Sequence, residues 1–185
     1  MFNIAVLGST RGSNLPGLAH HLQNSAIHIH SVISNKKNAG ILEKANELHL
    51  PTLYISNEQN DFEKKLDNFL LKNKTDLLVL MGFMKILSPW FIERGLKKII
   101  NVHPSLLPKH AGLMDLSVHQ SVLNAKEIES GCTVHWVSEQ VDSGEIILQK
   151  KCCVLPNDDA RSLKKRVQSL EVSALAESIK IVSRE

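Results

Sequence analysis

The sequence has little of what secreted and membrane proteins need. Its 185 residues include three cysteines, Cys132, Cys152 and Cys153. An odd number with two adjacent members does not fit a disulfide framework, so a reducing compartment is expected. The segment Met1 to Leu7 is too short for a signal peptide, and no apolar run approaches the length of a membrane-spanning helix. These absences predict a cytoplasmic protein that does not contact a membrane.

A strong charge of one sign is also missing. The formal net charge is +3, and the densest basic run is Lys164-Lys165-Arg166. No stripe of Lys and Arg is available for a nucleic acid, so we expect no nucleic-acid partner, whereas a phosphate-bearing small molecule remains compatible. The chain has 43% hydrophobic and 22% charged residues and no internal repeat, and we expect one globular domain over residues 1–185.

Apolar strand-like runs alternate with amphipathic helical patterns along the chain. Strands are expected over 3–7, 27–34, 51–55, 77–81, 99–103, 132–137 and 146–154. Helices are expected over 15–22, 39–48, 62–70 and 116–124, after Ser88-Pro89, and from Asp158-Asp159 onward. This alternation predicts βαβ units, an α/β fold and a mostly parallel sheet. Ligands of such sheets bind outside the carboxyl ends of the strands.

The first loop, Gly8–Asn14, has the pattern Gly-x-x-x-Gly-Ser-Asn. It matches neither the dinucleotide fingerprint nor the Walker loop. Its glycines, the N–H groups at a helix start, and the side chains of Ser13 and Asn14 are nevertheless suited to hold one phosphate. The alternative is a plain strand-to-helix turn capped by Asn14, and the loop alone does not decide between them.

A second candidate site is the strand end that contains Asn101 and His103. The two residues lie two positions apart, so in an extended strand their side chains share a face. Pro104 restricts the backbone there. A titratable imidazole beside an amide donor needs a carboxylate partner, and Asp142, in the turn Val141-Asp142-Ser143-Gly144, is the candidate.

A metal centre and a serine nucleophile are both disfavoured. The histidines lack the helical spacing with an acidic partner seen in zinc hydrolases, and His135, inside a strand, fits a packed core residue better. Ser105 is not in a Gly-x-Ser-x-Gly turn. We therefore expect no metal.

Four separated blocks of the sequence carry a resemblance to a known family. They are Gly12-Ser13-Asn14, Gly82–Pro89, Asn101–Lys109, and Gly131–His135 with Val141–Gly144. Together they resemble folate-dependent formyltransferases: the Asn-x-His-Pro-Ser-Leu-Leu-Pro block marks the wider group, and the Gly-Ser-Asn loop narrows it to phosphoribosylglycinamide formyltransferases of purine biosynthesis. The resemblance covers nearly the whole chain in order.

The resemblance implies a Rossmann-like sheet with helices on both faces, and transfer of a formyl group from 10-formyltetrahydrofolate, the co-substrate, to the amine of glycinamide ribonucleotide. Asn101 would donate to the developing oxyanion, His103 would protonate or polarise the intermediate, and Asp142 would keep His103 charged and help relay a proton. A monomer or a homodimer is expected.

The resemblance also implies the binding residues. Gly12, Ser13 and Asn14 would hold the substrate phosphate, and Glu171 would contact its ribose or amine, although the residue pattern alone favours a solvated helix face for Glu171. The folate would be bound at the backbone around Met84, Lys85, Ile86 and Leu87, and at Asn101 and Val141.

Three positions depart from the family pattern. Lys85 replaces a frequent arginine, Met114 replaces a histidine of some relatives, and Gln59 is neutral where a basic residue often faces the folate tail, a role that Lys64 or Lys65 would take over.

Other functions share parts of this pattern. A 10-formyltetrahydrofolate hydrolase would use the same three side chains but usually carries an N-terminal regulatory domain, and we expect none because the chain begins at its first strand. A methionyl-tRNA formyltransferase would need a basic C-terminal domain. A non-catalytic nucleotide-binding protein would leave Asn101, His103 and Asp142 unexplained.

Overall fold

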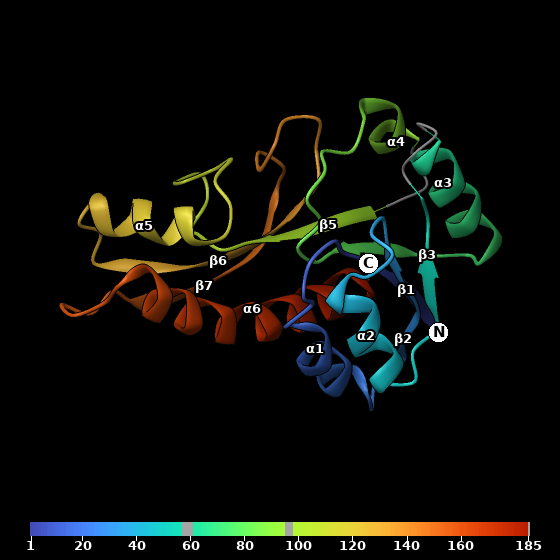
Figure 1. Cartoon of the computed structure of the whole chain (residues 1–185), viewed down its shortest axis with the longest axis horizontal. Helices are drawn as coiled ribbons and strands as arrows, with labels where there is room; N and C mark the ends of the chain where they lie inside the picture. The colour runs from blue at the N-terminus through green and yellow to red at the C-terminus, as the bar shows by residue number, and fades with distance from the viewer. Residues whose placement is uncertain (57–60, 95–97, 185) are drawn as a thin grey trace. The chain divides into compact units, whose positions relative to one another are not determined.

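The computed structural model describes residues 1–56, 61–94 and 98–184, in which strands and helices alternate (Figure 1). The strands are β1 (Phe2–Leu7), β2 (Ile27–Ser34), β3 (Thr52–Tyr54), β4 (Leu77–Leu80), β5 (Lys98–His103), β6 (Glu129–Trp136) and β7 (Ile146–Cys153). The helices are α1 (Leu15–Leu22), α2 (Gly40–Glu47), α3 (Phe62–Lys72), α4 (Pro89–Glu93), α5 (Leu116–Asn124) and α6 (Ala160–Val182). Within the described ranges, no helix is both long and apolar enough to cross a membrane.

The strands form a seven-stranded sheet in the order β3-β2-β1-β4-β5-β6-β7. β1 pairs in parallel with β2 and β4, β2 pairs in parallel with β3, and β6 runs antiparallel to β7. The predicted α/β fold with a mostly parallel sheet is therefore confirmed. The chain divides into two compact units, Met1–Ile100 and Asn101–Glu185, each described by itself below. The prediction of one domain stays a prediction.

The N-terminal unit is organised around two adjacent parallel strands. Ile4 to Leu7 of β1 and Leu77 to Val79 of β4 have no exposed surface, which fits continuous apolar runs in the interior of a sheet. The register pairs Leu7 with Leu80, so both strands end at the same edge. The loops that follow β1 and β4 leave the sheet from that edge, where ligands of such folds bind.

The C-terminal unit contains the β6–β7 hairpin, along which α6 packs (Figure 1). Asp159 caps α6 through a capping box with Ser162, which explains why the helix begins there. Leu163, Val167 and Ala174 form part of its buried face. β6 begins at Glu129 rather than at Cys132, because residues that are weak strand formers by sequence still pair with Cys153 and its neighbours across the hairpin.

Gly131 gives a test of this packing. A Cβ atom there would lie 2.0 Å from the carbonyl oxygen of Lys150 and 2.9 Å from a methyl of Leu106. We expect Gly131→Ala to lower the free energy of unfolding by about 1–3 kcal/mol, as overpacked substitutions do, measured by urea denaturation. Gly112→Ala is the matched control, since its added methyl meets no atom within 4 Å and its φ of 75° costs backbone strain alone. Equal losses in both variants would contradict the packing argument.

Candidate functional site

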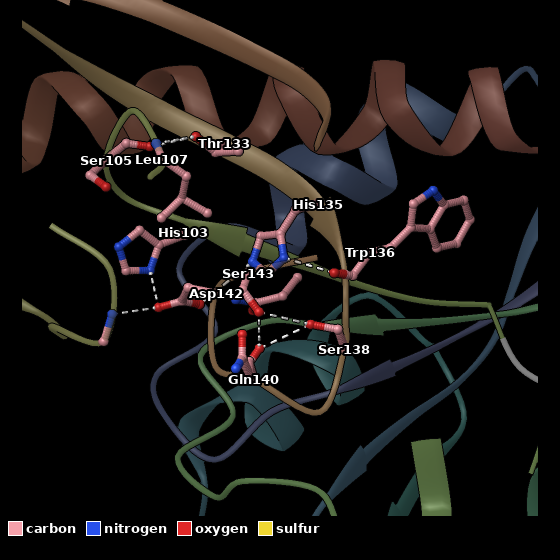
Figure 2. A network of polar contacts seen from close by, with 12 residues as sticks. His103, Ser105, Leu107, Thr133, His135, Trp136, Ser138, Gln140, Asp142 and Ser143 are labelled. Atoms are coloured by element: carbon pink, nitrogen blue, oxygen red, sulfur yellow. Dashed lines mark hydrogen bonds and ion pairs between the residues drawn. The ribbon is translucent and has the colours of Figure 1, made fainter. Parts of the chain in front are cut away.

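His103 and Asp142, far apart in the sequence, contact each other in the C-terminal unit. His103 is the last residue of β5, and Asp142 lies in the loop between β6 and β7. Nδ1 of His103 is 3.1 Å from Oδ2 of Asp142, and the two side chains are 4% and 9% exposed. Figure 2 shows the His103 ring pointing toward the Asp142 carboxylate, with a dashed line joining the two side chains. The structure thus brings together the imidazole and the carboxylate that the sequence predicted to be partners, while their catalytic roles stay predictions.

The second ring nitrogen of His103 also faces an acceptor. Nε2 is 3.1 Å from the carbonyl oxygen of His110. A carboxylate and a backbone carbonyl only accept hydrogen bonds, so satisfying both requires a hydrogen on each ring nitrogen. A ring with a hydrogen on both nitrogens is the form of histidine that can protonate an oxygen.

The charge of Asp142 is fixed by its surroundings. Burial opposes the ionisation of this carboxyl. It accepts hydrogen bonds from His103, from His135 and from the backbone N–H of Gly112, which lies 2.9 Å from Oδ2. These hydrogen bonds outweigh burial and hold the pKa of Asp142 well below its usual range. Asp142 has a φ of 55° and Gly112 a φ of 75°. The hydrogen bond between them therefore joins two residues with left-handed backbone conformations. The carboxylate is therefore charged whenever the protein is folded near neutral pH.

His135 belongs to this site, although its place inside a strand predicted only a packed residue. It lies on β6 and is 2% exposed, as expected for a packed residue, but its Nε2 is 3.5 Å from Oδ1 of Asp142 and 3.3 Å from Nδ2 of Asn101. Figure 2 shows it on the side of Asp142 opposite to His103. The available signal was its position in the Gly-Cys-Thr-Val-His block, but only the tertiary structure shows its contacts with the predicted catalytic residues.

The predicted phosphate loop lies in the N-terminal unit. Gly12 has a φ of 63°, and a Cβ there would lie 2.7 Å from Cα of Ile41, so this position requires glycine. Ser13 is exposed and Asn14 is buried. Asn14 is the N-cap residue of α1, without a capping hydrogen bond from its side chain, and the phosphate-binding role of this loop stays a prediction.

The predicted folate loop is tied directly to the phosphate loop. Ser9 is 4% exposed; its N–H donates to the carbonyl oxygen of Gly82 at 3.1 Å, and its hydroxyl accepts from the N–H of Met84 at 3.2 Å. The Ser9 hydroxyl donates in turn to Oδ1 of Asn35 at 2.8 Å. One buried serine therefore connects the two loops that follow β1 and β4.

The folate loop presents backbone and apolar surface to solvent. Met84 and Ile86 are 44% and 76% exposed, Lys85 is exposed and Leu87 is buried. Since the N–H of Met84 already donates to Ser9, only its carbonyl is left for a ligand. Backbone donors would have to come from the positions after Met84.

Two further predicted binding residues belong to the C-terminal unit. Val141, beside Asp142, is 49% exposed. Glu171 on α6 is 8% exposed, so the interpretation as a solvated helix face is wrong. Burial, together with the negative charge of Glu171, raises the pKa of the Cys132 thiol to about 12. Glu171 is a buried carboxylate, which is an uncommon and costly arrangement for a purely structural residue.

The remaining predictions concern Gln59, Met114 and the absence of a metal. Gln59 lies outside the described residues. Met114 is 54% exposed. In the described ranges, no three His, Cys, Asp or Glu side chains are grouped as a metal site, and the prediction of a metal-free reaction stays a prediction.

Known proteins resemble this chain over nearly its full length. The family model for formyl transferases matches residues 2–179. This chain belongs to the formyl transferase family. A family member from Haemophilus influenzae, a phosphoribosylglycinamide formyltransferase, is 40% identical, with 92% of this chain and 82% of that protein aligned. The resemblance inferred from the four sequence blocks is therefore confirmed.

Other relatives of this formyl transferase family member extend the comparison. A trifunctional purine biosynthetic protein of Drosophila melanogaster is 42% identical over 91% of this chain, which spans 13% of that protein. The crystal structure of a phosphoribosylglycinamide formyltransferase from Anaplasma phagocytophilum has a TM-score of 0.91 and 35% identity, covering 99% of this chain and 87% of that one. The fold is thus that of the formyltransferases.

Proposed function

We propose that the protein transfers the formyl group of 10-formyltetrahydrofolate to the amine of N1-(5-phosphoribosyl)glycinamide in purine biosynthesis. The observation that carries this proposal is the arrangement of Asn101, His103 and Asp142 in a chain of the formyl transferase family. An amide donor, an imidazole and a charged carboxylate in one part-buried network are the groups that direct formyl transfer requires.

The proposed reaction needs no covalent enzyme intermediate. The amine nitrogen attacks the formyl carbon, a C–N bond forms, and the carbonyl oxygen becomes an oxyanion that Asn101 stabilises as donor and His103 protonates or polarises. The proton lost by the attacking nitrogen is passed through the Asp142 network to N10 of the folate. The bond between the formyl carbon and N10 then breaks, leaving tetrahydrofolate and the formylated amide product.

Two loops of the N-terminal unit would bind the substrates. Gly12, Ser13 and Asn14 hold the phosphate with backbone N–H groups and side-chain donors. The segment Met84–Leu87 binds the pterin through its backbone, and Val141 contributes apolar surface. Glu171 binds the ribose or the amine, since a buried carboxylate suits hydroxyl or ammonium donors.

The proposed function also sets the partners. Both substrates are metabolites of the cytoplasm, where we place the protein, and neither nucleic acid nor metal takes part. The protein acts as a monomer or a homodimer.

One assay tests the proposal. Purified protein is mixed with 10-formyltetrahydrofolate, with and without glycinamide ribonucleotide, and loss of the formyl-folate is followed by absorbance. We expect turnover only with the amine. Equal turnover without the amine would indicate the hydrolase instead, and no turnover in either mixture would contradict both functions.

A further inference from the structure

Ser9, in the phosphate loop (Gly8–Asn14), makes two hydrogen bonds to the folate loop (Gly82–Leu87). Its backbone N–H donates to the carbonyl oxygen of Gly82 at 3.1 Å, and its side-chain hydroxyl accepts from the N–H of Met84 at 3.2 Å. Ser9 is 4% exposed, so both contacts are shielded from water, which strengthens them. Two hydrogen bonds placed two residues apart fix both the position and the direction of the segment from Gly82 to Met84.

The hydroxyl of Ser9 is oriented by a third loop. It donates to Oδ1 of Asn35, the residue that follows β2, at 2.8 Å. Because the hydrogen of the hydroxyl is used there, the lone pairs of its oxygen are left to accept from the N–H of Met84. A side chain without a hydroxyl would leave both Met84 and Asn35 without this partner, at a cost in free energy. Serine at position 9 therefore has a defined role in placing Met84.

The neighbour of Ser9 in the chain also lies close to the folate loop. Gly82 has a φ of 62°, and a Cβ atom there would collide with the hydroxyl of Thr10. The carbonyl oxygen of Thr10 in turn accepts from the N–H of Ile41, in the first turn of α2, at 3.0 Å. The phosphate loop is thus in close contact with both α2 and the folate loop. In such dense packing, a movement of residues 9–10 is transmitted to residues 82–84.

The folate loop depends on these contacts because much of it faces solvent. Met84 and Ile86 are 44% and 76% exposed, so their side chains have little packing to hold the loop in place. An anion bound at the phosphate loop would restrain the backbone around Ser9. The hydrogen bonds of Ser9 would then restrain Met84 as well, and a folate would bind a loop that has already lost part of its conformational freedom.

We propose that Ser9 is a positioning residue that couples the two substrate sites, so that a phosphate group bound at the phosphate loop raises the affinity of the folate loop for its folate. The inference rests on the proposed function, which supplies the ligands of the two loops. It assigns Ser9 no contact with either substrate. By thermodynamic linkage, the folate raises the affinity for the phosphate ligand by the same factor.

The test uses inorganic phosphate as the probe, because this ion has no ribose or amine that could touch a folate directly. The Kd of tetrahydrofolate is measured by calorimetry in phosphate and in sodium chloride of equal ionic strength. We expect phosphate to lower this Kd by about 5-fold or more, as coupled sites typically do. In Ser9→Ala this difference should vanish, and the Kd in sodium chloride should rise by about 2–10-fold, the scale of one hydrogen bond.

Ser31→Ala is the matched control. Ser31 is also a buried serine of the N-terminal unit, at 2% exposed, and its hydroxyl has no hydrogen-bond partner within the described part of the chain. The same loss of one oxygen atom there removes no contact between the loops. We expect Ser31→Ala to keep the full effect of phosphate on the Kd of tetrahydrofolate.

A merely structural role for Ser9 would give a different result. Ser9→Ala would then unfold at a lower temperature but keep the parent's effect of phosphate, which overturns the proposal. A parent protein whose Kd for tetrahydrofolate does not respond to phosphate overturns it too. If Ser9→Ala does not fold, Asn35→Ala takes its place, since Asn35 is half-buried and orients the same hydroxyl. It should reduce the effect of phosphate, and an unchanged effect would overturn the proposal.

Kinetics separates this inference from the proposed function. Ser9→Ala should raise KM for 10-formyltetrahydrofolate with little change in kcat, because the predicted acid–base groups are not altered. If phosphate and folate binding are coupled through Ser9 but no formyl group is transferred, the proposed function fails while the coupling stands. Formyl transfer in a parent protein without this coupling contradicts the inference alone.

Discussion

Asp142→Asn is expected to lower kcat by about 10²–10⁴-fold, the range that a positioned acid–base system contributes. Oδ2 of Asp142 accepts from Nδ1 of His103 and from the N–H of Gly112. The single oxygen of an asparagine side chain could still accept from these two donors, but the side chain carries no negative charge and would place an amide nitrogen where Oδ1 faces Nε2 of His135. The charge-assisted hydrogen bond that orients His103, the proposed acid, would therefore be lost. Turnover of 10-formyltetrahydrofolate with saturating amine measures the effect.

The folded structure should survive this change, because asparagine has nearly the same size and keeps an oxygen that can accept from His103 and Gly112. The control is Asp76→Asn, an exposed carboxylate that accepts from the N–H of Asn3 in the N-terminal unit. Activity of Asp142→Asn close to that of the parent and of Asp76→Asn would mean that the role assigned to Asp142 is wrong.

The same variant changes how stability depends on pH. The pKa of Asp142 is lowered in the folded state, below its ordinary value of 3.8. The carboxylate therefore contributes its full stability at a pH above 3.8, and this contribution is lost as the pH falls toward the lower pKa of the folded protein. We expect the difference in unfolding free energy between parent and Asp142→Asn to shrink as the pH falls below 3.8. Chemical denaturation across the acid range measures this difference. A difference that stays constant with pH would contradict the lowered pKa of this carboxyl.

Asn101→Ala is expected to lower kcat by about 10²–10³-fold, as removal of one oxyanion donor does in acyl-transfer enzymes. An amide hydrogen of Asn101 would interact with the oxygen only when negative charge develops there. Such an interaction stabilises the transition state and not the bound substrate, so KM should change little. Steady-state kinetics with each substrate varied separately measures the two parameters.

The matched control for this prediction is Asn124→Ala. Asn124 ends α5 and accepts from the side-chain amide of Gln120 on the exposed surface, so its loss should leave kcat unchanged. A rise in KM with an unchanged kcat in Asn101→Ala would show that Asn101 binds the folate in the ground state rather than stabilising the oxyanion.

The sequence determined the order and type of the secondary-structure elements because they depend on local signals. The apolar run of β4 requires burial on both faces, and the capping box at Asp159 starts α6. Gly12 was predicted from loop chemistry, and its φ of 63° is a local backbone property. Asn101 and His103 share a strand, so their proximity also follows from local geometry.

Only the tertiary structure decided which of these residues meet. Asp142 contacts His103 because the loop after β6 turns back through a left-handed position, which no periodicity in the sequence encodes. His135 was interpreted as a packed strand residue, and it is buried, but its Nε2 lies between Asp142 and Asn101. Glu171 sits on a helix whose pattern suggested solvent, yet it is buried. Hydrophobic periodicity predicts which face of an element is covered, whereas the partner of each buried polar group depends on contacts between segments far apart in the chain.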